Sequence, residues 1–470
     1  MSGFLESYGL MPSSKFVEGY KRLFRIHEIE STPVLQWMFG AMLFFFFLTF
    51  QSWDNNFSVT VEGAKSGAAV CWPYFQSCTN LFFLHSLPYG YSETTFYMLL
   101  YGLMLLTVYC IWRKMWAGAH ALMVTLLAWE LFVGFVLSYD LMGPYNYYHV
   151  ILCIVLLFLP LKEYFLKLAF VFCYFISVTI KFDPAWDVGT YFSTLQLGLP
   201  LIPRELIPLA TSIVIFMQVV GAWFLLSSRR MWQRVALTFF IFFHLYSGIF
   251  VAYFYPSISL PPLIILFGPM YRYQPPPRSK RSIAGWVFLA LLLVWQLAPY
   301  AVEGDRRVTL EENRIGMFMF EANHECRATV TVYESTSTST TSDKITQSQP
   351  GTFCSDTICT TLTDTHVQSG EKTIERQYES GSAWNRCDPY VIWFQYQTVC
   401  RQPNVQKISF VFDHSVDGGP FYRIVDLDNL CDVTYKPWGH NDWILLPSAS
   451  TADKPQAEIV GYPVEDNYRY

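Results

Sequence analysis

Charged residues are scarce in this chain. Asp, Glu, Lys and Arg make up only 15% of its 470 residues, and the net charge is −5. The basic residues form no cluster large enough to bind nucleic acid, so the sequence predicts no nucleic-acid partner. A Gly-rich phosphate loop, a CxxC pair and a Ser-His-Asp spacing are also absent from the sequence. The corresponding nucleotide-binding, thiol-redox and serine-hydrolase classes therefore have no support.

Signals for a metal site are equally weak. The triplets His440-Asn441-Asp442 and Asp426-Leu427-Asp428 contain residue types that bind metals. Turns are commonly rich in Asp and Asn, which is the simpler interpretation of both triplets. We therefore predict no metal.

The start of the chain lacks the pattern of a cleavable signal peptide. Residues Met1–Glu30 are mixed and polar, with no apolar core ahead of a small-residue cleavage site. Residues 1–32 combine aromatic side chains with charges, which predicts a cytoplasmic amphipathic segment. Such a segment either lies on the membrane surface or forms a loosely ordered tail.

Long apolar runs are what this sequence has in abundance. Hydrophobic residues make up 52% of the chain and aromatic residues 18%, and the long runs fall almost entirely before residue 302. A helix that spans a bilayer needs ~20 mostly apolar residues. We therefore predict an all-α polytopic membrane bundle over 33–302, with about nine transmembrane helices. These helices are expected at 33–51, 93–112, 119–138, 147–161, 165–181, 206–227, 233–254, 258–271 and 284–302.

Basic residues give this bundle an orientation. With the N-terminus cytoplasmic, only Lys65, Lys181 and Arg204 fall in the short loops on the outer side. Fifteen basic residues fall on the cytoplasmic side, namely Lys15, Lys21, Arg22, Arg25, Arg113, Lys114, Lys162, Lys167, Arg229, Arg230, Arg234, Arg272, Arg278, Lys280 and Arg281. Cytoplasmic loops of membrane proteins carry such an excess of Lys and Arg. An odd number of spans then places residues 303–470 outside the cytoplasm.

The cysteines agree with this topology. Three of the eleven, Cys110, Cys153 and Cys173, fall in expected helices. The other eight all fall on the outer side, at Cys71, Cys78, Cys326, Cys354, Cys359, Cys387, Cys400 and Cys431. An even number of cysteines in one compartment indicates disulfides in an oxidising space. The sequon at Asn56 lies on the same side and is a glycosylation site if the host is eukaryotic.

The chain changes character after residue 303. Segments rich in valine, isoleucine and aromatic residues alternate with turns containing Gly, Ser and Asp, which is typical of strands. The expected strands are Ala328–Tyr333, Tyr390–Tyr396, Lys407–Phe412 and Tyr422–Val425. We therefore predict a C-terminal, disulfide-stapled, mainly β domain over 303–470. The outer loop 52–92, which carries Cys71 and Cys78, is expected to pack on this domain or to be bonded to it.

One lysine stands at the expected outer end of the fifth helix. The stretch Tyr174–Tyr191 reads YFISVTIKFDPAWDVGTY, and Lys181 is its only basic residue. Two interpretations are open. The lysine either extends its charge to the headgroup region, or it is buried and acts as a base, because burial lowers the pKa of a lysine. His149 opens the fourth helix on the same side, so we expect these two residues at a similar depth.

This stretch resembles the segment of vitamin K-dependent γ-glutamyl carboxylases that holds their catalytic lysine. The matching positions are Tyr174, Phe175, Lys181, Asp183, Trp186, Gly189 and Tyr191. FHLYS at 243–247, GMFMFEANH at 316–324 and the region 407–447 also resemble later parts of this family, in the same order. The resemblance implies an HTTM-type membrane domain followed by an outer β domain, and we hypothesise a short member of the family.

The activity implied by the resemblance is carboxylation of protein glutamate with vitamin K hydroquinone, O₂ and CO₂. Neutral Lys181 would deprotonate the hydroquinone, which reacts with O₂ to give a strong base that removes the γ-proton of glutamate. The carbanion then captures CO₂ and the quinol becomes an epoxide. Apolar helices would keep such a site dry. The partners implied are the lipid bilayer and a glutamate-containing secretory protein, and the compartment is the endoplasmic reticulum, or the inner membrane of a bacterium.

The resemblance also implies roles for other residues. His244, Trp186, Tyr148 and His324 are expected to bind the cofactor. A family histidine that hydrogen-bonds near the lysine falls on Asn146 when residues are counted without gaps, whereas a shift of three residues supplies His149. Residues three apart share a helix face, so both remain candidates for the catalytic partner of Lys181.

A disulfide between the first outer loop and the β domain is a further implication of the resemblance. The candidate pairs are Cys71 or Cys78 with Cys387 or Cys400. More than one pairing stays open, because sequence alone does not set the connectivity.

A different class of function competes with the carboxylase. Lipase maturation factors have a similar Lys-…-Asp-Pro-x-Trp stretch, so the chain could instead be a membrane maturation factor or chaperone for secreted proteins. The uncertain position of the histidine motivates this alternative. A transporter has less support, because the sequence shows no pair of interrupted helices and no internal repeat.

Overall fold

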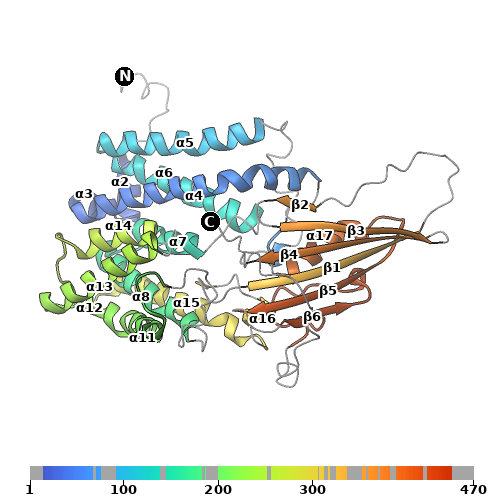
Figure 1. The fold of residues 1–470 in the computed structure, drawn as a ribbon. Coiled ribbons are helices and arrows are strands. Elements are labelled where there is room, and N and C mark those ends of the chain that lie inside the picture. Colours follow the sequence, from blue (N-terminus) through green and yellow to red (C-terminus); the bar gives the residue numbers. More distant parts are fainter. Residues whose placement is uncertain are drawn as a thin grey trace.

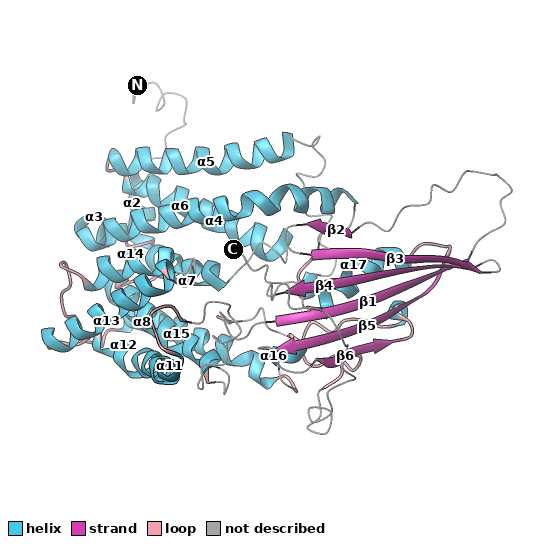
Figure 2. Cartoon of the chain, in the orientation of Figure 1, coloured by secondary structure: helices cyan, strands magenta, loops and turns pink. Residues whose placement is uncertain are grey.

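The computed structural model describes most of the chain. Described are residues 14–66, 70–75, 91–137, 144–182, 186, 199–250, 256–304, 306–311, 316–317, 324–335, 352–355, 358–368, 371–381, 388–416 and 421–446. Helices occupy one part of the molecule and a sheet the other, as Figures 1 and 2 show.

The described regular elements of the first part of the chain are all helices. Its N-terminal half contains α2 (Ser14–Leu23), α3 (Ile26–Ser31), α4 (Pro33–Ser66), α5 (Tyr91–Trp112), α6 (Trp116–Phe132), α7 (Pro144–Phe158) and α8 (Lys162–Ser177). Its second half contains α11 (Ile207–Phe216), α12 (Ala222–Phe224), α13 (Arg230–Ile249), α14 (Pro256–Phe267), α15 (Ile283–Leu297) and α16 (Arg306–Thr309). A π-helical turn, Met217–Gly221, joins α11 to α12.

Five of the helical segments are long and apolar enough to cross a membrane. They are Pro33–Gln51, Thr94–Trp112, Trp116–Val136, Ile207–Phe224 and Lys280–Ala301. Two further apolar helices, Tyr145–Phe158 and Pro256–Phe267, are shorter. The apolar helical architecture that the sequence predicts is thus confirmed, while the number of nine spans stays a prediction. The span expected at 33–51 coincides with the first of these segments, and α4 continues beyond it to Ser66, into the region expected to be a loop.

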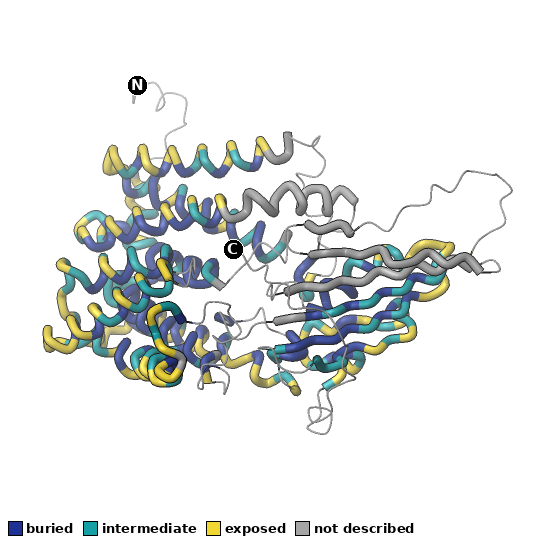
Figure 3. The backbone as a smooth tube through the Cα atoms, viewed as in Figure 1, coloured by how far each residue is buried: buried dark blue, intermediate teal, exposed yellow. Residues whose placement is uncertain are grey.

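Helix α8 lies at the centre of the helical part. Twelve of its sixteen residues are buried, and it contacts α4, α7, α12, α14 and α15. Figure 3 shows this burial against the more exposed outer helix α5. Helix α15 can approach α8 closely because Gly285 has no side chain, and a Cβ at that position would overlap the Phe165 ring.

The N-terminal segment packs on the helices rather than forming a loose tail over its described part. The Tyr20 hydroxyl lies 2.8 Å from His120 Nδ1, and Phe24 packs on the rings of His120 and Phe158. Helix α3 adds Glu28, whose carboxylate accepts hydrogen bonds from the backbone N–H groups of Leu161 and Lys162. The first N–H groups of a helix lack partners within the helix, so Glu28 caps α8 from a distant part of the chain.

The second part of the chain forms one antiparallel sheet. The strands are β1 (His324–Ser335), β2 (Thr352–Ser355), β3 (Ile358–Gln368), β4 (Glu371–Gly381), β5 (Val405–Val416) and β6 (Tyr422–Leu427), in the order β2-β3-β4-β1-β5-β6. In the central pair, Val330 faces Phe410 and Val332 faces Ile408, and all four side chains are buried. The strands expected at Ala328–Tyr333, Lys407–Phe412 and Tyr422–Val425 lie in β1, β5 and β6. Burial alternates along β1 and the first part of β5, as on one face of a strand, whereas Ile424 and Val425 of β6 are both buried.

The prediction of a strand at Tyr390–Tyr396 is wrong. This segment lies in helix α17 (Pro389–Cys400), which contacts β5. Asp388 caps the helix by accepting a hydrogen bond from Tyr390 N, and Pro389 occupies the first turn, where a missing N–H costs nothing. The buried side chains of Tyr390, Trp393 and Tyr396 recur every three residues, as on one face of a helix.

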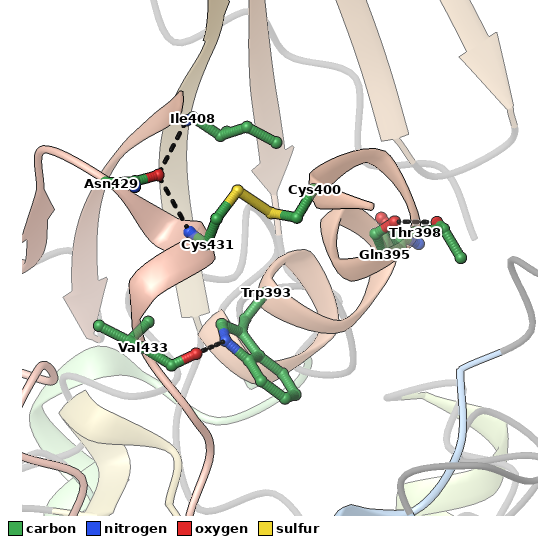
Figure 4. Close-up of a disulfide and its surroundings, with 8 residues drawn as sticks. All are labelled: Trp393, Gln395, Thr398, Cys400, Ile408, Asn429, Cys431 and Val433. Carbon is green, nitrogen blue, oxygen red and sulfur yellow. Dashed lines mark hydrogen bonds between the residues drawn. A yellow bond between two sulfur atoms is a disulfide. The ribbon is translucent and has the colours of Figure 1, made fainter. Parts of the chain in front are cut away.

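The disulfide prediction for Cys400 is also wrong. Cys400, at the end of α17, is bonded to Cys431 and not to Cys71 or Cys78 (Figure 4). Asn429 holds the second cysteine in place, since its side chain accepts hydrogen bonds from the N–H groups of Cys431 and Ile408. Cys71 and Cys326 are disulfide-bonded too, whereas Cys78 and Cys387 lie outside the described residues.

The helical part and the sheet are joined by specific contacts. The Tyr390 hydroxyl donates to the carbonyl of Cys71, and Tyr74 packs on Trp438, so the described segment between α4 and α5 packs on the second part of the chain as expected. Glu311 follows α16 and is buried, and its carboxylate accepts hydrogen bonds from the backbone and side chain of Asn441.

Candidate functional site

Lys181 lies buried at the end of the central helix. Helix α8 is followed directly by a 3₁₀ turn, Val178–Lys181. The side chain of Lys181, at the end of this turn, is only 7% exposed. Its Nζ lies 5.3 Å from the ring centre of Trp186, which is also buried. Within the described ranges no carboxylate pairs with this amine, and Asp183, Gly189 and Tyr191 lie outside those ranges. A cation over an indole ring is stabilised only modestly compared with an ion pair.

A hydrogen-bonded group centred on His244 lies near Lys181. His244 Nε2 is hydrogen-bonded to the Tyr174 hydroxyl of α8, and His244 Nδ1 lies 3.0 Å from the Ser259 hydroxyl of α14. A neutral imidazole has one N–H and one acceptor nitrogen. One hydroxyl therefore donates to the ring and the other accepts from it. Lys181 lies close enough to His244 for the two side chains to interact electrostatically.

Three helices position this group. Helix α13 buries Gln233, Ala236, Phe240 and His244, whose spacing of three and four residues places them on one face. Phe240 stacks on Tyr174 with ring centres 4.4 Å apart, which fixes the register between α13 and α8. Helix α14 contacts both neighbours and brings Ser259 to the imidazole.

His149 and Asn146 belong to a different cluster. His149 Nδ1 lies 3.2 Å from a carboxylate oxygen of Glu130 on α6. Asn146 Nδ2 lies 3.3 Å from the other oxygen of Glu130 and 3.4 Å from the Thr49 hydroxyl of α4. All four side chains are buried, and the Phe46 ring lies 4.4 Å from the imidazole. A buried carboxylate is costly unless it is paired and hydrogen-bonded, so this cluster ties α4, α6 and α7 together.

Lys181 does not directly contact the residues that were expected to be its partners, within the part of the chain that the structure describes. No hydrogen bond, ion pair or ring contact links Lys181 to His149 or to Asn146 among the described residues. The residues expected to partner the lysine therefore face Glu130 instead. Tyr148, between them in sequence, faces the other way and packs on Phe170 of α8 with ring centres 5.7 Å apart.

Sequence reasoning missed part of both clusters. Ser259 lies in the run PSISLPP, where nothing in the sequence distinguishes one serine as the hydrogen-bond partner of a distant histidine. Thr49 lies near the end of an aromatic-rich run, and nothing in the sequence identifies it as a hydrogen-bond partner of Asn146 either. Their partners come from other helices, so only the packing of the bundle identifies them. His324 begins β1, and the structure describes its backbone position only.

No set of three or more His, Cys, Asp or Glu side chains among the described residues converges as a metal site requires. Comparisons with known proteins add nothing to the geometry, since no protein-family model, curated protein or solved structure matches this chain.

Proposed function

We propose that this chain is a membrane enzyme that carboxylates glutamate side chains of secretory proteins with vitamin K hydroquinone, O₂ and CO₂. Lys181 is the base in this proposal. The observation that carries it is a buried amine without a carboxylate partner among the described residues, beside the indole of Trp186 and within electrostatic range of a hydrogen-bonded histidine. Burial without a counter-ion favours the neutral amine, which is the form that accepts a proton.

The residues around Lys181 suit a reduced quinone. The flat apolar ring of such a molecule would lie against Trp186, and one of its hydroxyl groups would lie within reach of Lys181 Nζ. His244 would line the other side of the site, with its ring orientation fixed by the hydrogen bonds of both ring nitrogens to Tyr174 and Ser259. When bound, the reduced quinone supplies the strong base that its reaction with O₂ generates. The chain's own part is to take the first proton at Nζ and to exclude water.

Removal of the amine tests the proposal directly. Purified protein in lipid is given a glutamyl peptide, reduced vitamin K and labelled CO₂, and incorporation of label is measured. Lys181→Met keeps an apolar side chain of similar length and removes the base, so we expect incorporation to fall to background. Lys280→Ala, a change of an exposed lysine, should leave it unchanged.

Chemical rescue separates a catalytic amine from a structural one. A small primary amine added to Lys181→Met should restore part of the incorporation, because it can enter the space that the lysine leaves. Incorporation by Lys181→Met equal to that of the unmodified chain would defeat the proposal.

A second candidate function is favoured by one observation. His149 and Asn146 face Glu130 and not Lys181, so the hydrogen-bonding partner expected for a catalytic lysine is engaged elsewhere. This favours a non-catalytic relative that acts as a membrane maturation factor or chaperone for secreted proteins. Stable co-purification with a secreted client, together with no quinol-dependent incorporation of CO₂, would support it.

The proposed setting is an integral membrane protein of the endoplasmic reticulum, or of a bacterial inner membrane, with nine spans and the sheet on the outer side. The disulfides at Cys71, Cys326 and Cys400–Cys431 support this side, because disulfides persist in oxidising compartments. Glycosylation at Asn56, near the end of α4, would test it, since only a segment on the outer side can acquire a glycan. A chain expressed in eukaryotic cells should therefore lose mass on glycosidase treatment, and Asn56→Gln should not.

A further inference from the structure

The region from α11 to α15 carries an unbalanced set of charges. Between residues 206 and 302 the sequence has seven Lys and Arg residues and no Asp or Glu. Three of these, Arg229, Arg230 and Arg234, lie at the start of α13 and are exposed. Their side chains form no ion pair with any residue that the structure describes. They are therefore free to bind an anion from outside the chain.

An open groove begins beside these arginines. It has a volume of about 630 Å³ and is lined by Met231, Arg234, Val235, Thr238 and Phe239. These residues recur at spacings of three and four along α13 and therefore share a helix face. The groove combines the Arg234 guanidinium with mostly apolar side chains, so it suits a ligand that is both anionic and apolar.

The same face of α13 stays apolar along its length. Val235, Phe242 and Ile249 are spaced by seven residues and are 51%, 67% and 68% exposed. From Met231 to Ile249 the helix rises ~27 Å, which is close to the ~30 Å thickness of the hydrocarbon layer of a bilayer. This face therefore fits an extended acyl chain that starts at the arginines.

We propose that the basic end of α13 binds an anionic phospholipid. Arg230 and Arg234 hold the phosphate, since they are four residues apart on one face and a guanidinium forms paired hydrogen bonds with phosphate oxygens. One acyl chain occupies the groove along Val235 and Phe239. The opposite, buried face of the same helix carries His244, so the lipid sits on the helix that positions the imidazole. The proposal does not depend on the carboxylase reaction.

Occupancy of this site can be measured as the amount of anionic lipid that the protein retains. The full chain is reconstituted in nanodiscs of phosphatidylcholine with a minority of phosphatidylglycerol, and native mass spectrometry counts the phosphatidylglycerol that stays bound. Arg234→Gln should lower its retention about fivefold relative to phosphatidylcholine, the effect of about one basic residue near a membrane surface. Arg113→Gln is the matched control, because Arg113 is exposed at the end of α5, across the helical part from α13 (Figure 1).

A second variant separates the groove from the charge. Val235→Trp fills the groove and keeps every arginine, and its position on the exposed face leaves the packing of α13 intact. We expect it to lower retention as well. Equal losses in Arg234→Gln and Arg113→Gln would overturn the site in favour of diffuse attraction, and unchanged retention in Val235→Trp would overturn the groove. Displacement of the lipid by added inorganic phosphate would show a site for free phosphate and overturn the proposal too.

Discussion

Acidification should weaken the sheet at His414, a fully buried histidine in β5. Its Nδ1–H donates a hydrogen bond to the carbonyl of Val308, 2.6 Å away in α16. Burial lowers the pKa of His414 to about 4, from an ordinary value of 6.5. The unfolded chain therefore binds a proton below pH 6.5, whereas the folded chain does not until about pH 4.

The sign and size of the effect follow from this difference. The stability that the neutral imidazole contributes is fully present above pH 6.5 and is lost as the pH falls from 6.5 toward 4. The whole effect is about 3 kcal/mol, at ~1.4 kcal/mol for each pH unit. Between pH 7 and pH 5 the loss is about 2 kcal/mol, or ~30-fold in the unfolding equilibrium.

Hydrogen exchange measured by mass spectrometry can test this in peptides from β1 and β5. After correction for the intrinsic effect of pH, protection in these strands should fall about 30-fold between pH 7 and pH 5. The variant His414→Asn keeps a donor for the Val308 carbonyl and cannot titrate in this range, so its protection should change less. The reasoning is refuted if the variant and the unmodified chain lose protection equally.

Three further changes test other contacts. Glu28→Ala removes the acceptor of two helix N–H groups and should cost about 2 kcal/mol in thermal unfolding, whereas Glu30→Ala, in a partly exposed ion pair, should cost less than about 1 kcal/mol. Ser259→Ala should lower CO₂ incorporation about tenfold while costing only about 1–3 kcal/mol of stability, because His244 loses a hydrogen bond that orients it; unaltered incorporation would remove the serine from the site. Cys400→Ser opens a disulfide that closes a sequence separation of 31 residues and should cost about 3–4 kcal/mol, so an unchanged melting temperature would contradict its role.

The helical part could be predicted because its signal is local. Apolar runs of the length of a bilayer indicate helices wherever their partners lie, and all five membrane-length segments coincide with expected ones. Boundaries were less predictable. Helix α4 passes its expected end by fifteen residues, because the polar residues after Gln51 favour a loop by composition although their backbone remains helical.

Helix α17 shows how composition can outweigh a better local signal. The segment PYVIWFQYQTVC has the aromatic and β-branched residues that are typical of strands. The pair Asp388-Pro389 marks a helix start in the sequence, with a capping carboxylate followed by proline at the first position. The capping residues therefore indicate a helix, whereas the residue types alone indicate a strand, and the prediction from residue type is the one that is wrong.

At the candidate site, Lys181, Trp186 and His244 were predicted from the sequence, whereas the groups that hydrogen-bond His244 were not. Lys181 stood out because it is the single basic residue in an apolar stretch, and its burial depends on Trp186 within the same stretch. The partners of His244 and His149 come from helices remote in sequence. Periodicity gives the buried face of a helix but not the side chain that faces it, so Ser259 and Glu130 required the packed structure.

The capping of α8 by Glu28 has a consequence for biosynthesis. The carboxylate precedes the two N–H groups that it binds by 133 and 134 residues. At ~5–20 residues per second, a ribosome needs roughly 7–27 seconds to make the intervening chain. Until then the glutamate has no helix to cap. The start of α8 acquires this cap only when the segment that carries Glu28 packs onto it. Docking of α3 and completion of the start of α8 are therefore one event.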